Sequence, residues 1–167
     1  MPAVVWFSVE TQPQGWVRLR TPVALVLPAT PAADRLAETL RGPRLSIETD
    51  PDFVTAAWHK LLTNAVGGLM ALSGRKSGCP AATTWPTWPS AEGAKLEDAV
   101  IEDVVGLFSG MPEDITTSIL TDRELGWPLE WDIRNGVIVR KAAEHGLATP
   151  ISAVLVPLLA AASDGPG

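Results

Sequence analysis

Short apolar runs separated by turn residues fill residues 1–50, a pattern typical of β-strands. The runs cover Val4–Phe7 and Val17–Leu27, and Gln14-Gly15 lies between them. Glycine after a polar residue is a common turn signal. We therefore predict a β-hairpin over residues 3–28.

A helix and one more strand are predicted after the hairpin. Thr30 is a suitable N-cap and Pro31 a suitable first helical residue, whereas Gly42-Pro43 ends the helical pattern. A strand is predicted over 44–48. Hairpin, helix and strand together make a sheet fragment with open edges, not a self-sufficient domain. We expect another segment to complete this sheet.

A long helix is predicted to begin at Thr49 or Asp50, which Pro51 and Asp52 follow, and to extend to about Leu72. Lys60 and Asn64 lie one turn apart on this helix and are followed by Gly67-Gly68. Two adjacent glycines inside a helix cost about 1 kcal/mol each relative to alanine, so they predict a close approach of backbone or ligand. A surface lysine and asparagine beside a helix-packing notch explain the same pattern. The expected buried positions are Val54, Trp58, Leu61, Leu62, Ala65 and Leu69.

Further helical patterns cover 95–108, 114–124 and 128–145, and a last helix is predicted from Thr149-Pro150. Gly146 is expected to end the third of them. Three prolines exclude a helix from the uncharged, tryptophan-rich segment between residues 77 and 91. The body of the chain is therefore predicted to be a mainly α helical bundle.

The composition of the chain argues against several classes of function. Apolar residues make up 46% and charged residues 19% of 167 residues, as in a folded globular protein. The net charge of −6, without a basic cluster, argues against nucleic acid as a partner. Cys79, His59 and His145 are too few for a zinc site. The longest apolar run is far below the roughly 20 residues of a membrane span, and the N-terminus lacks a signal-peptide pattern, so we expect a cytoplasmic protein.

Two separated stretches resemble one enzyme family. The first covers Trp58–Ala65 and continues over Leu69–Arg75, and it is similar to the W-x-K-L-x-x-N helix of ketopantoate reductases (2-dehydropantoate 2-reductases). The second is similar to the run S-M-x-x-D, G-x-x-x-E-x-D-x-x-N-G and H-G-x-x-x-P of that family. Its members here are Thr117–Asp122, Gly126–Ile133, Asn135-Gly136, His145-Gly146 and Thr149-Pro150.

The resemblance implies a fold and a division of the chain. Residues 50–167 would form a helical substrate-binding and dimerisation domain, of the type that ends ketopantoate reductases and 6-phosphogluconate dehydrogenases. An irregular Trp/Pro segment at 79–90 would interrupt it. Residues 1–49 would be a short α+β remnant of the cofactor domain. A homodimer is expected.

The implied activity is the NADPH-dependent reduction of a 2-keto acid, 2-dehydropantoate to pantoate, in pantothenate and coenzyme A biosynthesis. Reduction of a ketone leaves negative charge on the carbonyl oxygen, which a partly buried ammonium group can protonate. In the resemblance this acid is Lys60. Asn64 and Ser118 would bind the substrate, and Glu130 would accept hydrogen bonds from a substrate or cofactor hydroxyl. Taken singly, Ser118 is also explained as a surface serine and Glu130 as an acid favoured at a helix start.

The chain departs from the family at the cofactor site. No G-x-G-x-x-G follows a predicted strand, so the dinucleotide-binding unit is missing and a separate cofactor domain is a possible partner. The second asparagine of the family's opening helix is also missing, so the substrate can differ. Two other readings stay open. One is a non-catalytic binding or dimerisation module, and the other is the helical half of a related hydroxyacid or opine dehydrogenase.

The Trp/Pro segment has two interpretations. The codons GAC GTG GCC GAC CTG GCC encode the helical sequence Asp-Val-Ala-Asp-Leu-Ala, and a shift of one base turns them into Thr-Trp-Pro-Thr-Trp-Pro, the sequence of Thr84–Pro89. A frameshifted segment, with part of a helix lost before residue 94, is one interpretation. A genuine Trp/Pro recognition loop is the other.

Overall fold

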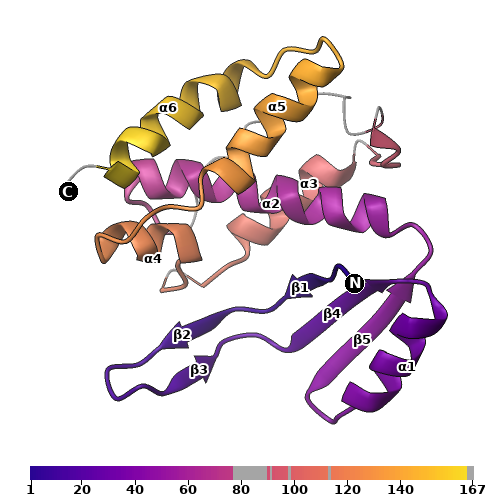
Figure 1. Ribbon diagram of the computed structural model, residues 1–167. Helices are drawn as coiled ribbons and strands as arrows, with labels where there is room; N and C mark the ends of the chain where they lie inside the picture. The colour runs from indigo at the N-terminus through magenta and orange to yellow at the C-terminus, as the bar shows by residue number, and fades with distance from the viewer. Residues whose placement is uncertain (77–89, 91, 98, 113, 165–167) are drawn as a thin grey trace. The chain divides into compact units, whose positions relative to one another are not determined.

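The computed structural model describes residues 1–76, 90, 92–97, 99–112 and 114–164 (Figure 1). The chain divides into two compact units, Met1–Ala57 and Trp58–Gly167. Helices dominate, so the predicted mainly α fold is confirmed. Apart from Ser90, the Trp/Pro segment at 79–90 lies outside the described residues, and both of its interpretations stay open.

The first unit holds a small mixed sheet in the order β1-β4-β5. The central strand β4 (Val23–Pro28) pairs antiparallel with β1 (Val4–Trp6) and parallel with β5 (Leu45–Asp50). A second, two-stranded sheet pairs β2 (Val9–Thr11) with β3 (Val17–Leu19). The predicted hairpin is therefore present, but it is divided between two sheets.

The turn and the helix of this unit form where the sequence predicts them. Gly15 has φ +78°, which favours glycine, and it lies at the tip between β2 and β3. Helix α1 (Pro31–Leu40) joins β4 to β5. The Thr30 hydroxyl accepts a hydrogen bond from the Ala33 amide at 3.2 Å and caps the helix. Both the predicted start and the predicted end of this helix are confirmed.

The second unit is an α-helical bundle built on α2 (Phe53–Ser73), which crosses from the first unit at Trp58. In Figure 1, α3 and α4 lie on one side of α2, and α5 and α6 lie on the other. The other elements are α3 (Ala99–Ser109), α4 (Ser118–Glu124), the π-helical turn η2 (Asp132–Gly136), α5 (Val137–Glu144) and α6 (Pro150–Asp164). The predicted helix over 128–145 is thus shorter, and its first part is a π-helical turn. Gly146, at φ +67°, ends α5 as predicted.

Three apolar clusters surround α2, and each contains residues of that helix. The first joins Val66 and Met70 to α3 and α4, the second joins Leu62 and Ala65 to α5, and the third joins Ala71 to α4 and α6. Helix α2 is therefore the element on which the others pack. Of the expected buried positions, Val54 is exposed. Leu96 packs on the second cluster from a position before α3.

The two adjacent glycines of α2 form a close-packed surface, here called the glycine notch (Gly67 and Gly68). A Cβ atom at Gly67 would lie 3.2 Å from Ile119 Cγ2 and 3.7 Å from Arg134 Nη1. One at Gly68 would lie 2.7 Å from the buried Asn135 Oδ1 and 3.0 Å from Leu159 Cδ1. Side chains of other helical elements make this close approach, in place of the backbone or ligand that the glycines predict. The observed packing is the helix-packing notch of the alternative explanation.

Gly68→Ala should destabilise the folded chain by roughly 1 to 3 kcal/mol, because the added methyl group overlaps the buried amide of Asn135. The matched control is Gly106→Ala in α3, where nothing lies within 4 Å of the added atom. That exposed helical position should gain up to about 1 kcal/mol. Urea unfolding of both variants measures the difference. Equal stability of the two variants would contradict the tight notch.

Candidate functional site

The polar residues predicted from the sequence belong to α2, to the start of α4 and to the segment before η2. Lys60 and Asn64 lie on α2, one turn apart and both half-buried. Burial lowers the pKa of the Lys60 ammonium group, and the positive charge of Arg134 lowers this pKa further. A lysine with a lowered pKa releases its proton more readily, which suits a proton donor. Lys60 and its neighbour His59 also interact, and burial lowers the pKa of His59.

Arg134 connects two of the other predicted residues. Its Nη2 donates one hydrogen bond to Ser118 Oγ and another to Glu130 Oε2, each 2.9 Å long. The side chain of Arg134 is 9% exposed, whereas that of Glu130 is 54% exposed. One buried guanidinium group therefore fixes two exposed side chains that are 12 residues apart in the sequence.

The π-helical turn explains why Arg134 points inward. In η2 the Gly136 amide donates to the Trp131 carbonyl oxygen, five residues earlier, at 3.0 Å. Such turns are frequent at functional sites because they change which side chains face the interior. Arg134, Asn135 and Gly136 are all buried here. An exposed ion pair between Asp132 and Arg140 spans the same turn.

Ser118 begins α4 directly after Thr117. The Ser118 oxygen accepts from Arg134, so its hydroxyl hydrogen can be donated to another group. The neighbouring Thr117 Oγ1 and Arg134 Nε are buried without a hydrogen-bond partner in the described part of the chain. Asp122, also on α4, has a pKa raised by burial and by the charge of Glu130. The site therefore combines cations, carboxylates and unsatisfied polar atoms in one place.

Three of the four predicted site residues are linked through Arg134, two by hydrogen bonds and Lys60 by charge. Asn64 makes no hydrogen bond to the other three among the described residues and is placed only by its position on α2. Arg134 itself was missed from the sequence. The signal that points to it is its spacing of four residues from Glu130, which places acid and base on one helical face.

Comparison with known proteins identifies the relatives of this chain. Residues 87–163 match the family model described as "Ketopantoate reductase PanE/ApbA C terminal". The 2-dehydropantoate 2-reductase of Mycobacterium tuberculosis is 55% identical over 184 positions, which cover 100% of this chain and 60% of that protein. The chain therefore resembles ketopantoate reductases.

Two solved structures share the fold. A dimeric ketopantoate reductase from Staphylococcus aureus superposes with a TM-score of 0.82 at 23% identity, over 96% of this chain and 60% of that one. D-mandelate dehydrogenase in complex with NADH superposes with a TM-score of 0.84 at 22% identity, over 97% of this chain and 61% of that one. The fold is therefore shared by enzymes with different names.

The chain spans 60% of the length of its M. tuberculosis relative, so the activity of a whole ketopantoate reductase is not carried over directly. The matched region is 184 positions long, 17 more than the 167 residues of the chain, so at least 17 positions of the relative have no counterpart. Loss of part of a helix near residues 79–90 would account for such positions, and it stays a prediction.

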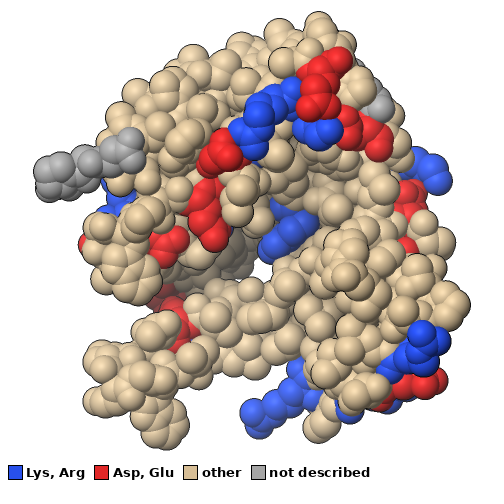
Figure 2. Space-filling view, viewed as in Figure 1, with Lys and Arg blue, Asp and Glu red and all other residues tan. Residues whose placement is uncertain are grey.

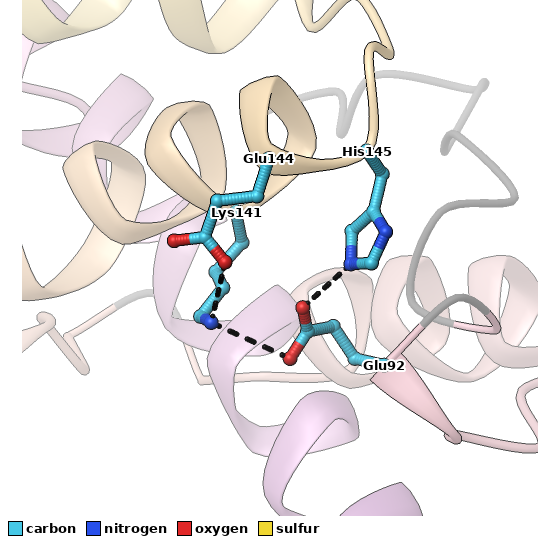
Figure 3. A network of polar contacts seen from close by, with 4 residues as sticks. All are labelled: Glu92, Lys141, Glu144 and His145. Atoms are coloured by element: carbon cyan, nitrogen blue, oxygen red, sulfur yellow. Dashed lines mark hydrogen bonds and ion pairs between the residues drawn. The ribbon is translucent and has the colours of Figure 1, made fainter.

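A second polar cluster joins α5 to the segment before α3 (Figure 3). Glu92 contacts His145 Nε2 at 2.7 Å and Lys141 Nζ at 3.6 Å, and Lys141 also contacts Glu144 at 2.8 Å. Figure 2 shows acidic and basic side chains interspersed over α5. Exposed ion pairs of this kind each contribute roughly 0 to 1 kcal/mol. The cluster ties one segment to α5, and the ketopantoate reductase motif assigns it no chemistry.

The described residues contain neither a candidate metal site nor a candidate membrane-spanning helix. They contain no group of three or more His, Cys, Asp or Glu side chains that could hold a metal ion. No described helix is long and apolar enough to cross a membrane.

Lys60→Met should raise the melting temperature at pH 7. Because the pKa of Lys60 lies below its usual value of 10.5, the charged form destabilises the folded chain at every pH below the folded pKa. This penalty disappears as the pH rises from the folded pKa toward 10.5, so the advantage of methionine should shrink there.

The control is Lys141→Met on α5. Hydrogen bonding to Glu144 raises the pKa of Lys141, so its charged form stabilises the folded chain at neutral pH. This variant should therefore melt no higher than the wild type at pH 7. Thermal melts between pH 6 and 11 compare the two variants. A lower melting temperature for Lys60→Met at pH 7 would show that the lysine is not penalised by burial.

Proposed function

We propose that this chain is the substrate-binding part of an NADPH-dependent 2-keto acid reductase that converts 2-dehydropantoate to pantoate, a step in pantothenate and coenzyme A biosynthesis. The observation that carries the proposal is that one buried arginine donates hydrogen bonds to both Ser118 and Glu130. The charge of the same arginine lowers the pKa of Lys60, alongside burial. The resemblance to ketopantoate reductases adds support, since the M. tuberculosis relative bears the name of this enzyme.

The chain's own residues fit a 2-keto acid. Lys60 holds a proton that a partly buried ammonium group can give to the substrate's carbonyl oxygen as that oxygen gains negative charge. The Ser118 hydroxyl can donate to the substrate carboxylate, and Asn64 offers an amide one turn from Lys60. Glu130 can accept a hydrogen bond from a substrate or cofactor hydroxyl. NADPH, when bound, supplies the hydride.

The described residues do not fit the diphosphate of NADPH. Anion sites of this kind need a glycine-rich turn from a strand into a helix whose first amides are free to donate. The junction from β4 to α1 instead reads Ala29-Thr30-Pro31, without glycine, and Pro31 has no amide hydrogen. The Ala33 amide is already bound by Thr30. We therefore derive no step through the cofactor and assign its binding to a separate segment.

The proposed assembly is a cytoplasmic homodimer. The S. aureus neighbour of the same fold is a dimer, which supports this part of the proposal. A non-catalytic binding module of the same family is the second candidate, because the cofactor-binding turn is missing from the described strand and helix junction.

NADPH should show no saturable binding to the purified chain at micromolar concentration, because nothing at the β4 to α1 junction cradles its phosphates. Titration of NADPH fluorescence measures this. The control is the same chain with the unmatched segment of the M. tuberculosis relative fused ahead of Met1. The fusion should bind. Binding by the unfused chain would place a cofactor site within it.

Lys60→Ala in that fusion should lower kcat by roughly 10²- to 10⁴-fold, the usual effect of removing a general acid. Turnover of 2-dehydropantoate is followed by the loss of NADPH absorbance. The control Lys141→Ala, from the exposed cluster of Figure 3, should keep most of the rate. A Lys60→Ala variant that also keeps most of the rate would move the chemistry to another residue. A wild-type fusion that binds NADPH without turnover would favour the non-catalytic module.

A further inference from the structure

Arg134 is the only charged residue that is buried among those the structure describes. Taking a guanidinium group out of water costs several kcal/mol unless it is fully paired. Its pairing here is incomplete, because Nε lies buried without a partner in the described part of the chain and the one carboxylate it binds is exposed. Apolar side chains of similar volume often replace buried charged groups without loss of stability. The charge therefore requires an explanation other than stability.

We propose that Arg134 is a positioning residue, which holds the Ser118 hydroxyl and the Glu130 carboxylate in fixed places for one end of a 2-keto acid. This inference rests on the proposed function and adds a residue to it. Arg134 acts through the two side chains it binds, and it is not itself called catalytic.

The geometry of one nitrogen carries the proposal. Both hydrogens of Nη2 are engaged, one by Ser118 Oγ and one by Glu130 Oε2, each at 2.9 Å. Because a guanidinium group is planar and rigid, the two acceptors are held at a fixed angle to each other. Ser118 begins α4 and Glu130 precedes η2, so no local backbone structure sets their separation.

The hydrogen bonds also orient what the two side chains present outward. Since Ser118 Oγ accepts from Arg134, its own hydrogen is turned toward another acceptor, and a substrate carboxylate is such an acceptor. Glu130 uses Oε2 toward Arg134, so Oε1 can accept from a hydroxyl. Both side chains are exposed, while Arg134 lies behind them.

The Arg134 guanidinium group lies beside the glycine notch. Arg134 Nη1 and Thr117 Oγ1 each lie 3.7 Å from the place of a Cβ atom at Gly67, an ordinary van der Waals distance. The tight neighbour of that Cβ would be Ile119 Cγ2, at 3.2 Å. The guanidinium group is therefore packed against the backbone of α2 at this glycine.

Arg134 also affects the proton donor. Its charge lowers the pKa of Lys60, alongside burial. The other titratable groups around these two residues are His59 on α2, Asp122 on α4 and Glu130, while Asp103 on α3 faces His59. Loss of the Arg134 charge should therefore raise the pKa of Lys60, an effect that a purely structural role would not produce.

The test compares Arg134→Met with Arg134→Lys in the fusion described above. Methionine removes both the charge and the hydrogen bonds, so KM for 2-dehydropantoate should rise roughly 10- to 100-fold, as expected for lost hydrogen bonds to a charged group. NMR titration of the Lys60 side chain in the 167-residue chain should show a higher pKa. The melting temperature should stay the same or rise. Lysine keeps the charge without the planar fork, so it should keep the low pKa of Lys60 and still raise KM.

An Arg134→Met variant with unchanged KM and unchanged Lys60 pKa would overturn the proposal. If Arg134→Met does not fold, the charge is needed for stability, which also contradicts it. Ser118→Ala supplies an independent check, because its effect on KM should not add to that of Arg134→Lys if the arginine acts through the serine. Full additivity would overturn the proposed linkage. If the wild-type fusion shows no turnover, the proposed function is wrong. The positioning role of Arg134 is then wrong as well, because it rests on that function.

Discussion

The hydrogen bonds of Arg134 to Ser118 and Glu130 depend on several structural features around α2. The guanidinium group lies beside α2, with Nη1 3.7 Å from the place of a Cβ atom at Gly67. The π-helical turn directs Arg134 inward, and it directs Asn135 onto Gly68 at the same time. The apolar clusters of α2 then hold α4 and α5 at the distances these contacts require. A change in any of these features would move Ser118 and Glu130 relative to Lys60.

The side chains around Arg134 are held in fixed positions at a cost in the stability of the folded chain. A buried arginine with an exposed partner contributes little to folding, and the unsatisfied Nε, Thr117 Oγ1 and Asn135 Oδ1 add a cost. Two glycines within α2 add about 1 kcal/mol each. The apolar clusters around α2 offset these costs. Polar atoms left unsatisfied beside a half-buried lysine are typical of a binding site, where a ligand completes the hydrogen bonds.

The sequence predicted most helices because their ends carry local signals. Thr30 caps α1 through its hydroxyl, and Gly146 ends α5 at a positive φ. The π-helical turn at 132–136 was not predicted, because its five residues have no hydrophobic period that differs from that of an α-helix. The hairpin was predicted, but its division into two sheets was not. The division lies between the β1–β4 and β2–β3 pairings, where the Ser8 amide donates to the Thr21 hydroxyl oxygen.

Only part of the candidate site could be predicted from the sequence. Lys60, Asn64, Ser118 and Glu130 came from the order of family motifs, and their roles remain proposals. Arg134 has no such motif. Its spacing of four residues from Glu130 indicates one of its contacts. Its hydrogen bond to Ser118 joins η2 to α4, and no local pattern encodes that contact.

The central claim is that the described helical unit alone carries the 2-keto acid site. The most direct measurement is a backbone NMR titration of the 167-residue chain with 2-dehydropantoate. We expect saturable shifts that cluster at Lys60, Asn64, Ser118 and Glu130, with the cluster around Glu92 and His145 unaffected. Shifts confined to Glu92 and His145, or no shifts at all at millimolar ligand, would contradict the account.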